Sequence, residues 1–565
     1  MIRIAEIKLT LAQAESPEST EVALRAAACG ILGLPPEALG DIHVFKRSFD
    51  ARKAELMAVF IVDITLADPS QEAAVLQQLA GRPNVGMTPD MEWRAPLTPE
   101  AAAAWALDHP QAPRPVVVGF GPCGIFAALV LAQMGLRPIV LERGKAVRQR
   151  TKDTWGLWRK NLLQAESNVQ FGEGGAGTFS DGKLYSQIKD PRHLGRKVMD
   201  EFVKAGAPEE ILYAAHPHIG TFKLVKVVEN LREQIIALGG EVRFQQRVID
   251  FIIEGEGDNR HLRGLRVLDQ SSGEVSGQVT ELRADQVVLA LGHSSRDTFE
   301  QLHTRGIFLE SKPFSVGFRI EHPQGMIDRA RWGRHAGHPL LGAADYKLVH
   351  HASNGRAVYS FCMCPGGTVV AATSETGRVV TNGMSQYSRN ERNANAGIVV
   401  GIDPRDYPGD DPLAGMRLQR ELESRAYVLG GSTYEAPGQL VGDFIAGRPS
   451  VEFGEVQPSY KPGVKLGDLH QALPAYAIEA MREALPLFGR KIAGFDRHDA
   501  VLTGVETRTS APLRITRGDN YQSLNLRGLY PAGEGAGYAG GILSAGVDGI
   551  KVGEAVARER LAVAA

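Results

Sequence analysis

The sequence predicts an α/β protein in which a domain built on a parallel sheet is interrupted by a mixed α+β domain and preceded by a small α+β domain. From residue 115 the chain alternates strand, glycine turn, helix and strand, and residues 528–557 return to strand, glycine loop and helix. Between residues 310 and 505 the composition is mixed, with short strand and loop signals. A length of 565 residues gives room for two or three hydrophobic cores.

The expected organisation begins with an N-terminal accessory domain at residues 1–95. Segments 2–11, 43–48 and 56–64 of this domain read as strands, and segments 20–32 and 71–79 read as helices. A linker at 96–114 follows, in which Pro99 opens an alanine-rich turn of helix, and Pro110, Pro113 and Pro115 stiffen the connection to the next domain. Residues 115–310 and 505–565 are the expected two parts of the discontinuous domain, and residues 311–504 form the expected substrate domain.

The composition argues for a globular cytoplasmic protein. Hydrophobic residues make up 43% and charged residues 23%, and the net charge of -2 provides no basic field that would favour nucleic acid as the main ligand. The longest apolar stretch, 116–141, is interrupted by prolines and polar residues, so no membrane span is expected. The four cysteines are too few for a secreted disulfide framework, and the sequence indicates no particular oligomeric state.

A GxGxxG pattern occurs three times, but only one occurrence has the context of a dinucleotide-binding turn. Gly119, Gly121 and Gly124 follow an apolar strand at 116–118, open an apolar helix at 125–134 and precede a second strand at 139–141 that leads into Glu142. The pattern at 172–177 is not followed by a helix, and the pattern at 535–540 has its acidic residue on the following helix. We therefore predict a single dinucleotide turn.

A physical role explains the residue type at each key position of this turn. Gly119 permits the tight turn, Gly121 lets the backbone approach a pyrophosphate, and the start of the helix offers N–H groups and a positive dipole to phosphates. Gly124 allows close packing of helix on strand. Glu142 can accept hydrogen bonds from ribose hydroxyls. The predicted site also includes Pro122, Cys123 and Arg143, with Cys123 interpreted as a small packing residue rather than a reactive thiol.

The C-terminal segment distinguishes FAD from NAD. A strand delivers Gly533 and Glu534, and a glycine loop then leads through Gly541 into a helix at Ile542. This arrangement resembles the second flavin-contact motif of glutathione-reductase-type flavoproteins, in which the acidic residue binds a ribityl hydroxyl and the helix N-terminus faces the flavin. The strand at 287–291 with Gly292 resembles the intermediate glycine motif of that fold. Val248 lies where such proteins place a backbone contact to adenine.

Four further segments resemble a family of largely uncharacterised bacterial FAD-dependent dehydrogenases. They are residues 171–184, 313–319, 362–367 and 505–510, and the N-terminal segment 47–53 also matches. The resemblance covers essentially the whole chain. It implies a discontinuous FAD-binding Rossmann-like domain with an inserted substrate domain and an N-terminal accessory domain. Cofactor contacts are expected from Gly174, Gly175, Gly177 and Thr178.

Three residues are candidates for catalysis. Segment 173–183 is expected to cover the flavin, where Asp181 and Lys183 could fix the substrate or tune the flavin; the alternative is a structural loop with an exposed charge pair. Cys362 and Cys364 form a CxC pair that would share one face of a strand. In one interpretation both are buried cysteines without a chemical role. In the other, Cys364 lines the flavin pocket and acts as an acid, base or nucleophile.

Two other groups of polar residues are considered, one as metal ligands and one as an ion pair. His216 and His218 lack a third partner at metal-ligand spacing, so no metal site is expected. Glu506 and Arg508 could form an ion pair in the pocket or at the surface.

The function we expect is hydride transfer between bound FAD and an unidentified small organic substrate, with NAD(P)H binding transiently if it is used. One alternative is a flavoprotein that acts on a macromolecule such as tRNA, with the N-terminal domain as docking module. The near-neutral charge counts against this alternative. Another alternative is a non-catalytic protein that uses the nucleotide structurally, which a complete set of flavin motifs disfavours.

Overall fold

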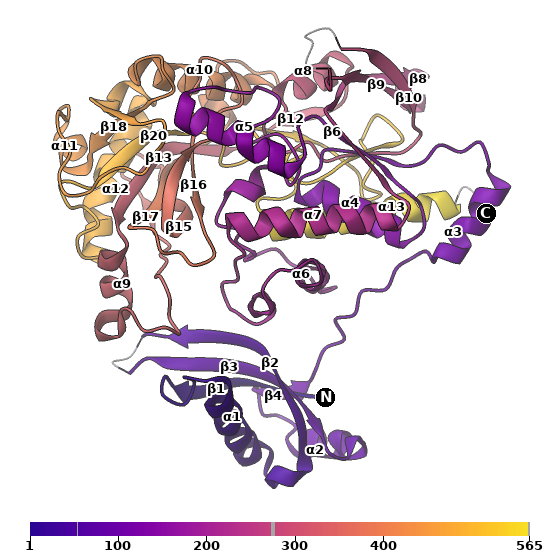
Figure 1. The fold of residues 1–565 in the computed structure, drawn as a ribbon, viewed down its shortest axis with the longest axis vertical. Coiled ribbons are helices and arrows are strands. Elements are labelled where there is room, and N and C mark those ends of the chain that lie inside the picture. Colours follow the sequence, from indigo (N-terminus) through magenta and orange to yellow (C-terminus); the bar gives the residue numbers. More distant parts are fainter. Residues whose placement is uncertain (53–54, 273–276, 563–565) are drawn as a thin grey trace.

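The computed structural model describes residues 1–52, 55–272 and 277–562. Lys53, which closes the 47–53 motif, lies outside the described residues. Figure 1 shows a small N-terminal domain set apart from a larger body, with an extended segment and helix α3 (Pro99–Asp108) joining the two. Pro99 starts α3 next to Thr98, whose hydroxyl accepts the Ala101 N–H at 3.3 Å and caps the helix.

The N-terminal domain is a four-stranded antiparallel sheet in the order β2-β3-β1-β4 with two helices packed on it. Its elements are β1 (Ile2–Thr10), α1 (Pro17–Leu32), β2 (Leu39–Asp50), β3 (Met57–Leu66), α2 (Glu72–Gln78) and β4 (Val85–Met87). Helix α1 begins before the expected Thr20 because Ser16 and Ser19 cap it reciprocally. Strand β4 was not expected, since a strand of only 3 residues is too short to show alternation.

The body contains a five-stranded parallel sheet in the order β22-β11-β5-β6-β7. Its strands are β5 (Val116–Val118), β6 (Ile139–Glu142), β7 (Glu241–Phe244), β11 (Val287–Leu289) and β22 (Leu529–Pro531). Because β22 comes from the C-terminal end of the chain and pairs with β11, the sheet is assembled from segments on both sides of the intervening residues.

The two faces of the parallel sheet are covered differently. Val117 and Val288 face α4 (Pro122–Gln133), α7 (Thr221–Ala237) and α13 (Ile542–Ala562), whereas the alternate residues face a three-stranded antiparallel sheet and α8. The elements of this second layer are β8 (Gln246–Glu254), β9 (His261–Asp269), β10 (Val279–Arg283) and α8 (Arg296–Thr304). Helix α13 lies along α4, so close that a Cβ at Gly549 would stand 2.2 Å from the Cys123 carbonyl oxygen.

The inserted domain is built on an eight-stranded sheet in the order β14-β15-β17-β13-β20-β18-β19, with β16 pairing β15. Its strands are β13 (Phe314–Pro323), β14 (Val349–His351), β15 (Ala357–Ala371), β16 (Thr381–Ser385), β17 (Asn393–Ile402), β18 (Ala436–Leu440), β19 (Val464–Leu466) and β20 (Val501–Glu506). Its helices are α9 (Gln324–Trp332), α10 (Ala414–Leu429), α11 (Val441–Ala446) and α12 (Ala475–Lys491). Strand β20 runs across the expected boundary at 504/505, because it pairs with the central strand β13.

The remaining elements complete the body. They are α5 (Val147–Lys160), α6 (Leu194–Lys204) and the two-stranded pair β12 (Leu309–Ser311) and β21 (Leu513–Ile515). None of the helices in the described ranges combines the length and the apolar character needed to cross a membrane.

The N-terminal domain touches the body through the end of β2. The Arg47 N–H donates to the Tyr213 carbonyl at 2.6 Å, and the Arg47 carbonyl accepts the Ala215 N–H at 2.9 Å. The Arg47 guanidinium also donates to Glu210 at 3.0 Å. A small apolar cluster that includes Leu11 and Leu341 forms a second contact. The accessory domain is therefore joined to the body by more than its linker.

Candidate functional site

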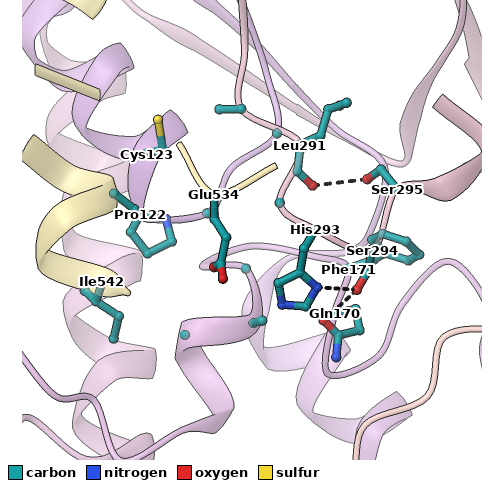
Figure 2. A pocket seen from close by; sticks show the side chains of 18 of the residues that line it. Pro122, Cys123, Gln170, Phe171, Leu291, His293, Ser294, Ser295, Glu534 and Ile542 are labelled. Carbon is teal, nitrogen blue, oxygen red and sulfur yellow. Dashed lines mark hydrogen bonds between the residues drawn. The ribbon is translucent and has the colours of Figure 1, made fainter. Parts of the chain in front are cut away.

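A cavity of about 350 Å³ lies between the carboxyl edge of the parallel sheet and the inserted domain. Its walls bring together most of the predicted site residues: Gly119, Gly121, Pro122, Cys123, Glu142, Arg143, Gly175, Gly177, Asp181, Lys183, Val248, Gly292, Glu534, Gly541 and Ile542. Figure 2 shows the first turns of α4 and α13 side by side at this cavity, marked by Pro122 and Ile542. Five other predicted residues do not line it: Gly124, Gly174, Thr178, Gly533 and Cys364.

The glycines of the first turn serve two different purposes. A Cβ at Gly119 would stand 2.2 Å from the Ala290 carbonyl oxygen, and a Cβ at Gly124 would stand 2.0 Å from the Gly119 carbonyl oxygen. These two glycines are therefore required by close packing within the protein. A Cβ at Gly121 would meet only the backbone of Gly175. The nearest atom, the Gly175 Cα, would lie 3.5 Å away, an ordinary van der Waals distance. Gly121 lines the cavity without a side chain, which leaves the space beside the N-terminus of α4 open for a ligand.

The Glu142 carboxylate is held at the edge of the cavity by backbone amides. It accepts hydrogen bonds from the N–H groups of Phe120 at 2.9 Å, Gly144 at 2.8 Å and Gly172 at 2.9 Å. Two carboxylate oxygens offer about four acceptor positions. The side chain is thus fixed in orientation and keeps acceptor capacity toward the cavity.

Arg143 lines the cavity but its guanidinium is already engaged. It donates to Glu166 and to Asp297, both at 2.8 Å, and lies over the Phe171 ring at 4.1 Å. Val248 and the neighbouring Arg247, at the start of β8, also line this end of the cavity.

The C-terminal glycine segment contributes one acidic side chain and open space. A Cβ at Gly533 would stand 2.8 Å from the Cys123 Cβ, so this glycine serves packing between β22 and α4. The Glu534 side chain points into the cavity (Figure 2), where burial raises its pKa to about 7 against the opposing charge of Lys312. A Cβ at Gly292 or Gly541 would have no neighbouring atom within 4 Å. The glycines therefore leave room that a large planar cofactor can occupy.

Segment 173–183, which was expected to cover the flavin, lines one side of the cavity, although two of its residues face the protein interior. A Cβ at Gly174 would stand 2.1 Å from the Thr178 hydroxyl, and Thr178 is buried. The predicted cofactor contacts of these two residues are corrected, because Gly174 packs against the Thr178 hydroxyl and neither residue lines the cavity. Asp181 lines the cavity and accepts from Arg389 at 3.0 and 2.6 Å, while the Lys183 ammonium contacts the Met363 carbonyl.

The CxC pair is arranged differently from the expectation. Cys362 lines the cavity, whereas Cys364 is fully buried behind it. Strand β15 is irregular between Phe361 and Cys364, and Cys362 has a φ of 43°, so the alternation of side chains is broken there. The candidate of the pair that reaches the cavity is therefore Cys362 and not Cys364.

Glu506 and Arg508 do not pair with each other, and both are buried beside the cavity. Glu506 accepts from Arg319 at 2.7 Å, and Arg319 also donates to the Cys362 carbonyl at 2.8 Å. Arg508 binds Glu423 on α10 with two hydrogen bonds of 3.1 and 3.0 Å. The structure thus shows two separate buried ion pairs, Glu506 with Arg319 and Arg508 with Glu423, in place of a pair between Glu506 and Arg508.

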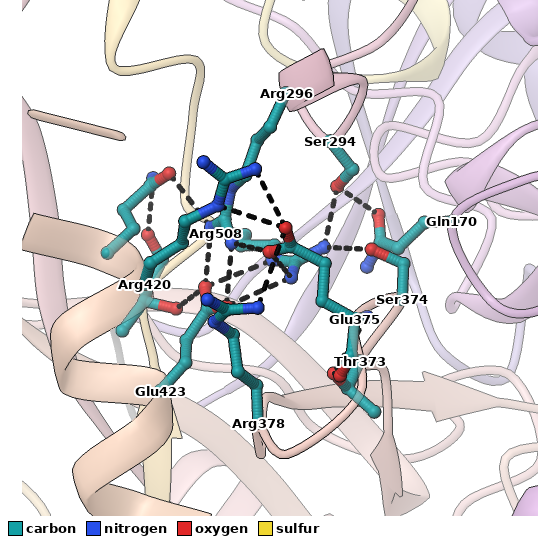
Figure 3. Close-up of polar contacts among 12 residues, drawn as sticks. Gln170, Ser294, Arg296, Thr373, Ser374, Glu375, Arg378, Arg420, Glu423 and Arg508 are labelled. Carbon is teal, nitrogen blue, oxygen red and sulfur yellow. Dashed lines mark hydrogen bonds and ion pairs between the residues drawn. The ribbon is translucent and has the colours of Figure 1, made fainter. Parts of the chain in front are cut away.

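A buried charge cluster joins the two halves of the site (Figure 3). Glu423 accepts from Arg296, the first residue of α8, at 2.8 and 2.6 Å, as well as from Arg508. Arg508 extends the network by donating to Ser294 at 3.0 Å and to Ser374 at 2.8 Å. Because these residues come from both domains, the cluster fixes the inserted domain against the parallel-sheet domain.

Several cavity residues were not predicted. His293, Ser294, Tyr185, Phe361, Cys362 and Asn382 line the cavity. Burial, with the charges of Arg508 and Arg296, lowers the pKa of His293 to about 3, so its ring is neutral at physiological pH. The CxC spacing could have indicated that Cys362 lines the cavity. The sequence around the other residues contains no motif that would have predicted their position at the cavity.

The two histidines of the 216–218 segment form no metal site. His216 lies 3.1 Å from Asp345, and the His218 ring nitrogen lies 2.9 Å from the Tyr387 carbonyl. Among the described residues no group of three or more His, Cys, Asp or Glu side chains could hold a metal ion.

Comparison with known proteins gives one full-length relative. An uncharacterised protein of Clostridium beijerinckii is 45% identical over 555 residues, which cover 98% of each chain. The chain belongs to the family of this protein. Residues 313–509 match the family model described as "FAD-dependent protein, C-terminal domain-like", and residues 1–65 match a domain of unknown function. The inserted domain is therefore of the type found at the C-terminus of FAD-dependent proteins.

Similar solved structures include flavoproteins at low identity. The quinol fumarate reductase FrdA of E. coli is 12% identical, with 80% of this chain and 71% of that chain covered and a TM-score of 0.35. A flavoprotein/dehydrogenase from Cytophaga hutchinsonii is 13% identical, with 80% and 79% covered and a TM-score of 0.35. Scores this low contribute nothing to the assignment of a substrate.

Proposed function

We propose that this protein is an FAD-dependent oxidoreductase that transfers hydride between bound FAD and a small organic molecule. The observation that carries the proposal is the continuity of the cavity. One cavity runs from the dinucleotide turn at Gly121, past Glu142, to Glu534 and on to Cys362 of the inserted domain. A dinucleotide held at one end would present its other end to the inserted domain.

The residues of the cavity fit the parts of FAD. The N-terminus of α4 would hold the pyrophosphate, Glu142 the adenosine ribose and the backbone at Val248 the adenine. Glu534 and the N-terminus of α13 would hold the flavin end, where the open space at Gly541 accommodates a planar ring. The match of residues 313–509 to the domain of FAD-dependent proteins supports this cofactor.

When bound, FAD supplies the hydride chemistry, and the chain positions the substrate and excludes water. Segment 171–184 closes one side of the cavity, and the paired Asp181 and Arg389 hold it in place. Lys183 provides a positive charge at the boundary between this segment and the inserted domain. A nicotinamide nucleotide would bind only transiently, because the sequence contains a single complete dinucleotide turn.

A macromolecular substrate docked on the N-terminal domain is the weaker candidate. Residues 1–95 contain nine Lys and Arg against thirteen Asp and Glu. An acidic domain repels the phosphate backbone of a nucleic acid.

The test begins with the purified protein. We expect a yellow preparation whose denatured supernatant contains FAD in a ratio near one per chain, identified by chromatography against FAD, FMN and NAD standards. Anaerobic mixing with NADH and NADPH then shows which nucleotide bleaches the flavin. Colourless protein that binds NAD would contradict the proposal. Nucleic acid that copurifies and is removed by RNase would favour the macromolecular candidate instead.

A further inference from the structure

The backbone at Cys362 presents one thiol of the CxC pair to the cavity and keeps the other behind it. In a regular strand, residues 362 and 364 would point the same way. The left-handed φ of 43° at Cys362 and the two irregularities of β15 around Cys364 break that pattern. Left-handed backbone at a residue other than glycine is uncommon, and β-bulges are frequent beside active sites. The local conformation therefore places Cys362 toward the cavity at a cost in backbone strain.

The Cys364 thiol lies against the backbone of Cys362 despite the different exposure of the two side chains. The Cys364 Sγ lies 3.3 Å from the Cys362 carbonyl oxygen. A hydrogen bond from Cys364 is also the largest influence that lowers the pKa of the Cys362 thiol. The glycines at 367 and 383 make room for Cys364, because a Cβ at Gly383 would stand 3.0 Å from its Sγ and a Cβ at Gly367 3.3 Å from its Cβ.

Two cationic side chains contact the backbone at Cys362 and Met363, and the charge of Asp181 opposes their effect on the Cys362 thiol. Arg319, which is fully buried, donates to the Cys362 carbonyl at 2.8 Å, and the Lys183 ammonium contacts the carbonyl of Met363. With the hydrogen bond from Cys364, these charges lower the pKa of Cys362 to about 5, against the effect of burial. The same contact and burial raise the pKa of Cys364. The two opposite shifts favour a thiolate at Cys362 beside a thiol at Cys364, the reactive form of a dithiol.

We infer that Cys362 and Cys364 form a redox-active dithiol/disulfide pair that exchanges two electrons with FAD bound in this cavity. The inference rests on the proposed function, since it requires the flavin. Cys362 lines the same cavity as Glu534, and its charge contributes to the raised pKa of that carboxyl. The thiol thus opens into the same cavity as the carboxylate that we assign to the flavin end of the cofactor.

The exchange balances without another reactant. In oxidation of the pair, the S–H bond of Cys364 breaks and an Sγ–Sγ bond forms between Cys364 and the Cys362 thiolate. Two electrons and the proton released from Cys364 pass to FAD, which becomes its singly protonated reduced anion. In the reverse direction the reduced flavin returns the electrons and the proton, and the disulfide opens to a thiolate and a thiol. A disulfide couple takes up two electrons, so the pair doubles the electron capacity of the site.

The first test counts thiols and does not depend on the flavin. Air-oxidised holoprotein, unfolded in denaturant, should show two thiols reactive toward a chromogenic disulfide, those of Cys29 and Cys123, and four after reduction. Peptide mapping should place an intramolecular disulfide between Cys362 and Cys364. Four reactive thiols in protein that has been exposed to air and to oxidised glutathione would overturn the inference.

The second test counts electrons. Anaerobic dithionite titration of the holoprotein should consume two electron pairs per flavin in the wild type and one pair in Cys362→Ser and in Cys364→Ser. Cys29→Ser, in the N-terminal domain, is the matched control and should still consume two pairs. FAD content and thermal melting are measured for each variant, and Cys364→Ala provides a second variant if the serine at this buried position impairs folding.

The outcomes separate the two proposals. Colourless protein would overturn the proposed function. Yellow wild-type protein that consumes a single electron pair per flavin would overturn the dithiol pair alone. Consumption of two pairs by Cys362→Ser would also overturn it, because the second pair would then reside elsewhere.

Discussion

Arg508 binds the carboxylate of Glu423 with two hydrogen bonds, of 3.1 and 3.0 Å, across the junction between the inserted domain and the parallel-sheet domain. Glu423 is fully buried and also accepts from Arg296, so it binds both guanidinium groups, and the partly exposed Glu375 is their second counter-ion. The charges of these two arginines hold the pKa of Glu423 well below its usual range, against the effect of burial.

Glu423→Ala should be strongly destabilising. The substitution leaves Arg296 and Arg508 buried with a deficit of negative charge, and breaking a buried pair in this way costs about 3–5 kcal/mol. The free energy of unfolding from urea denaturation measures the loss. Arg405→Ala is the control, because Arg405 is 90% exposed in its ion pair with Asp403. Equal stability of Glu423→Ala and wild type would show that the cluster contributes nothing.

Gly121→Val should abolish retention of FAD without unfolding the protein. A Cβ at Gly121 meets only the Gly175 backbone, nearest at the Cα at 3.5 Å, so the protein itself tolerates the first carbon of the side chain. The rest of the valine enters the path of the pyrophosphate. FAD content per chain after gel filtration is the measurement. Gly86→Val is the matched control, since a Cβ there has no neighbour within 4 Å and lies in the N-terminal domain. Stoichiometric FAD in Gly121→Val would refute the assignment of the turn.

Local features of the chain were predictable from the sequence, whereas contacts between distant segments were not. The turn at Gly119 and Gly121 and the acid at Glu142 belong to one strand-turn-helix-strand unit, whose pattern is complete within about 25 residues. The Arg508 partner lies on a helix far away in the sequence, and no spacing rule connects the two. The exchange of roles between Cys362 and Cys364 depends on a bulge in β15, which alternation cannot reveal.

The stability of flavin-free protein should fall as pH rises from about 4.5 to about 7, in part because of Glu534. Burial raises the pKa of this carboxyl to about 7 from its usual 4.5, so the folded state binds more protons than the unfolded state across that window. Its contribution is complete below pH 4.5 and lost above pH 7, with a slope of at most about 1.4 kcal/mol per pH unit.

Glu534→Gln isolates this contribution. Urea denaturation at several pH values should give a flatter pH dependence for the variant than for the wild type, because glutamine does not titrate. All other titratable groups are the same in both proteins, so their effects cancel in the comparison. Parallel curves for variant and wild type would show that Glu534 has an ordinary pKa.

Cys362 should react with iodoacetamide at a rate that rises with pH up to about pH 6 and then remains constant. The thiolate is the reactive form, and the pKa of Cys362 is lowered to about 5, first by the hydrogen bond from Cys364 and then by the charges of Arg319 and Lys183. Peptide mapping of reduced protein after timed alkylation separates Cys362 from the other cysteines. Lys183→Met removes one positive charge and should shift the profile to higher pH, whereas Lys347→Met, at an exposed lysine, should leave it unchanged. A wild-type profile that rises through pH 8, as for an ordinary thiol with a pKa of about 8.5, would show that these neighbours do not activate Cys362.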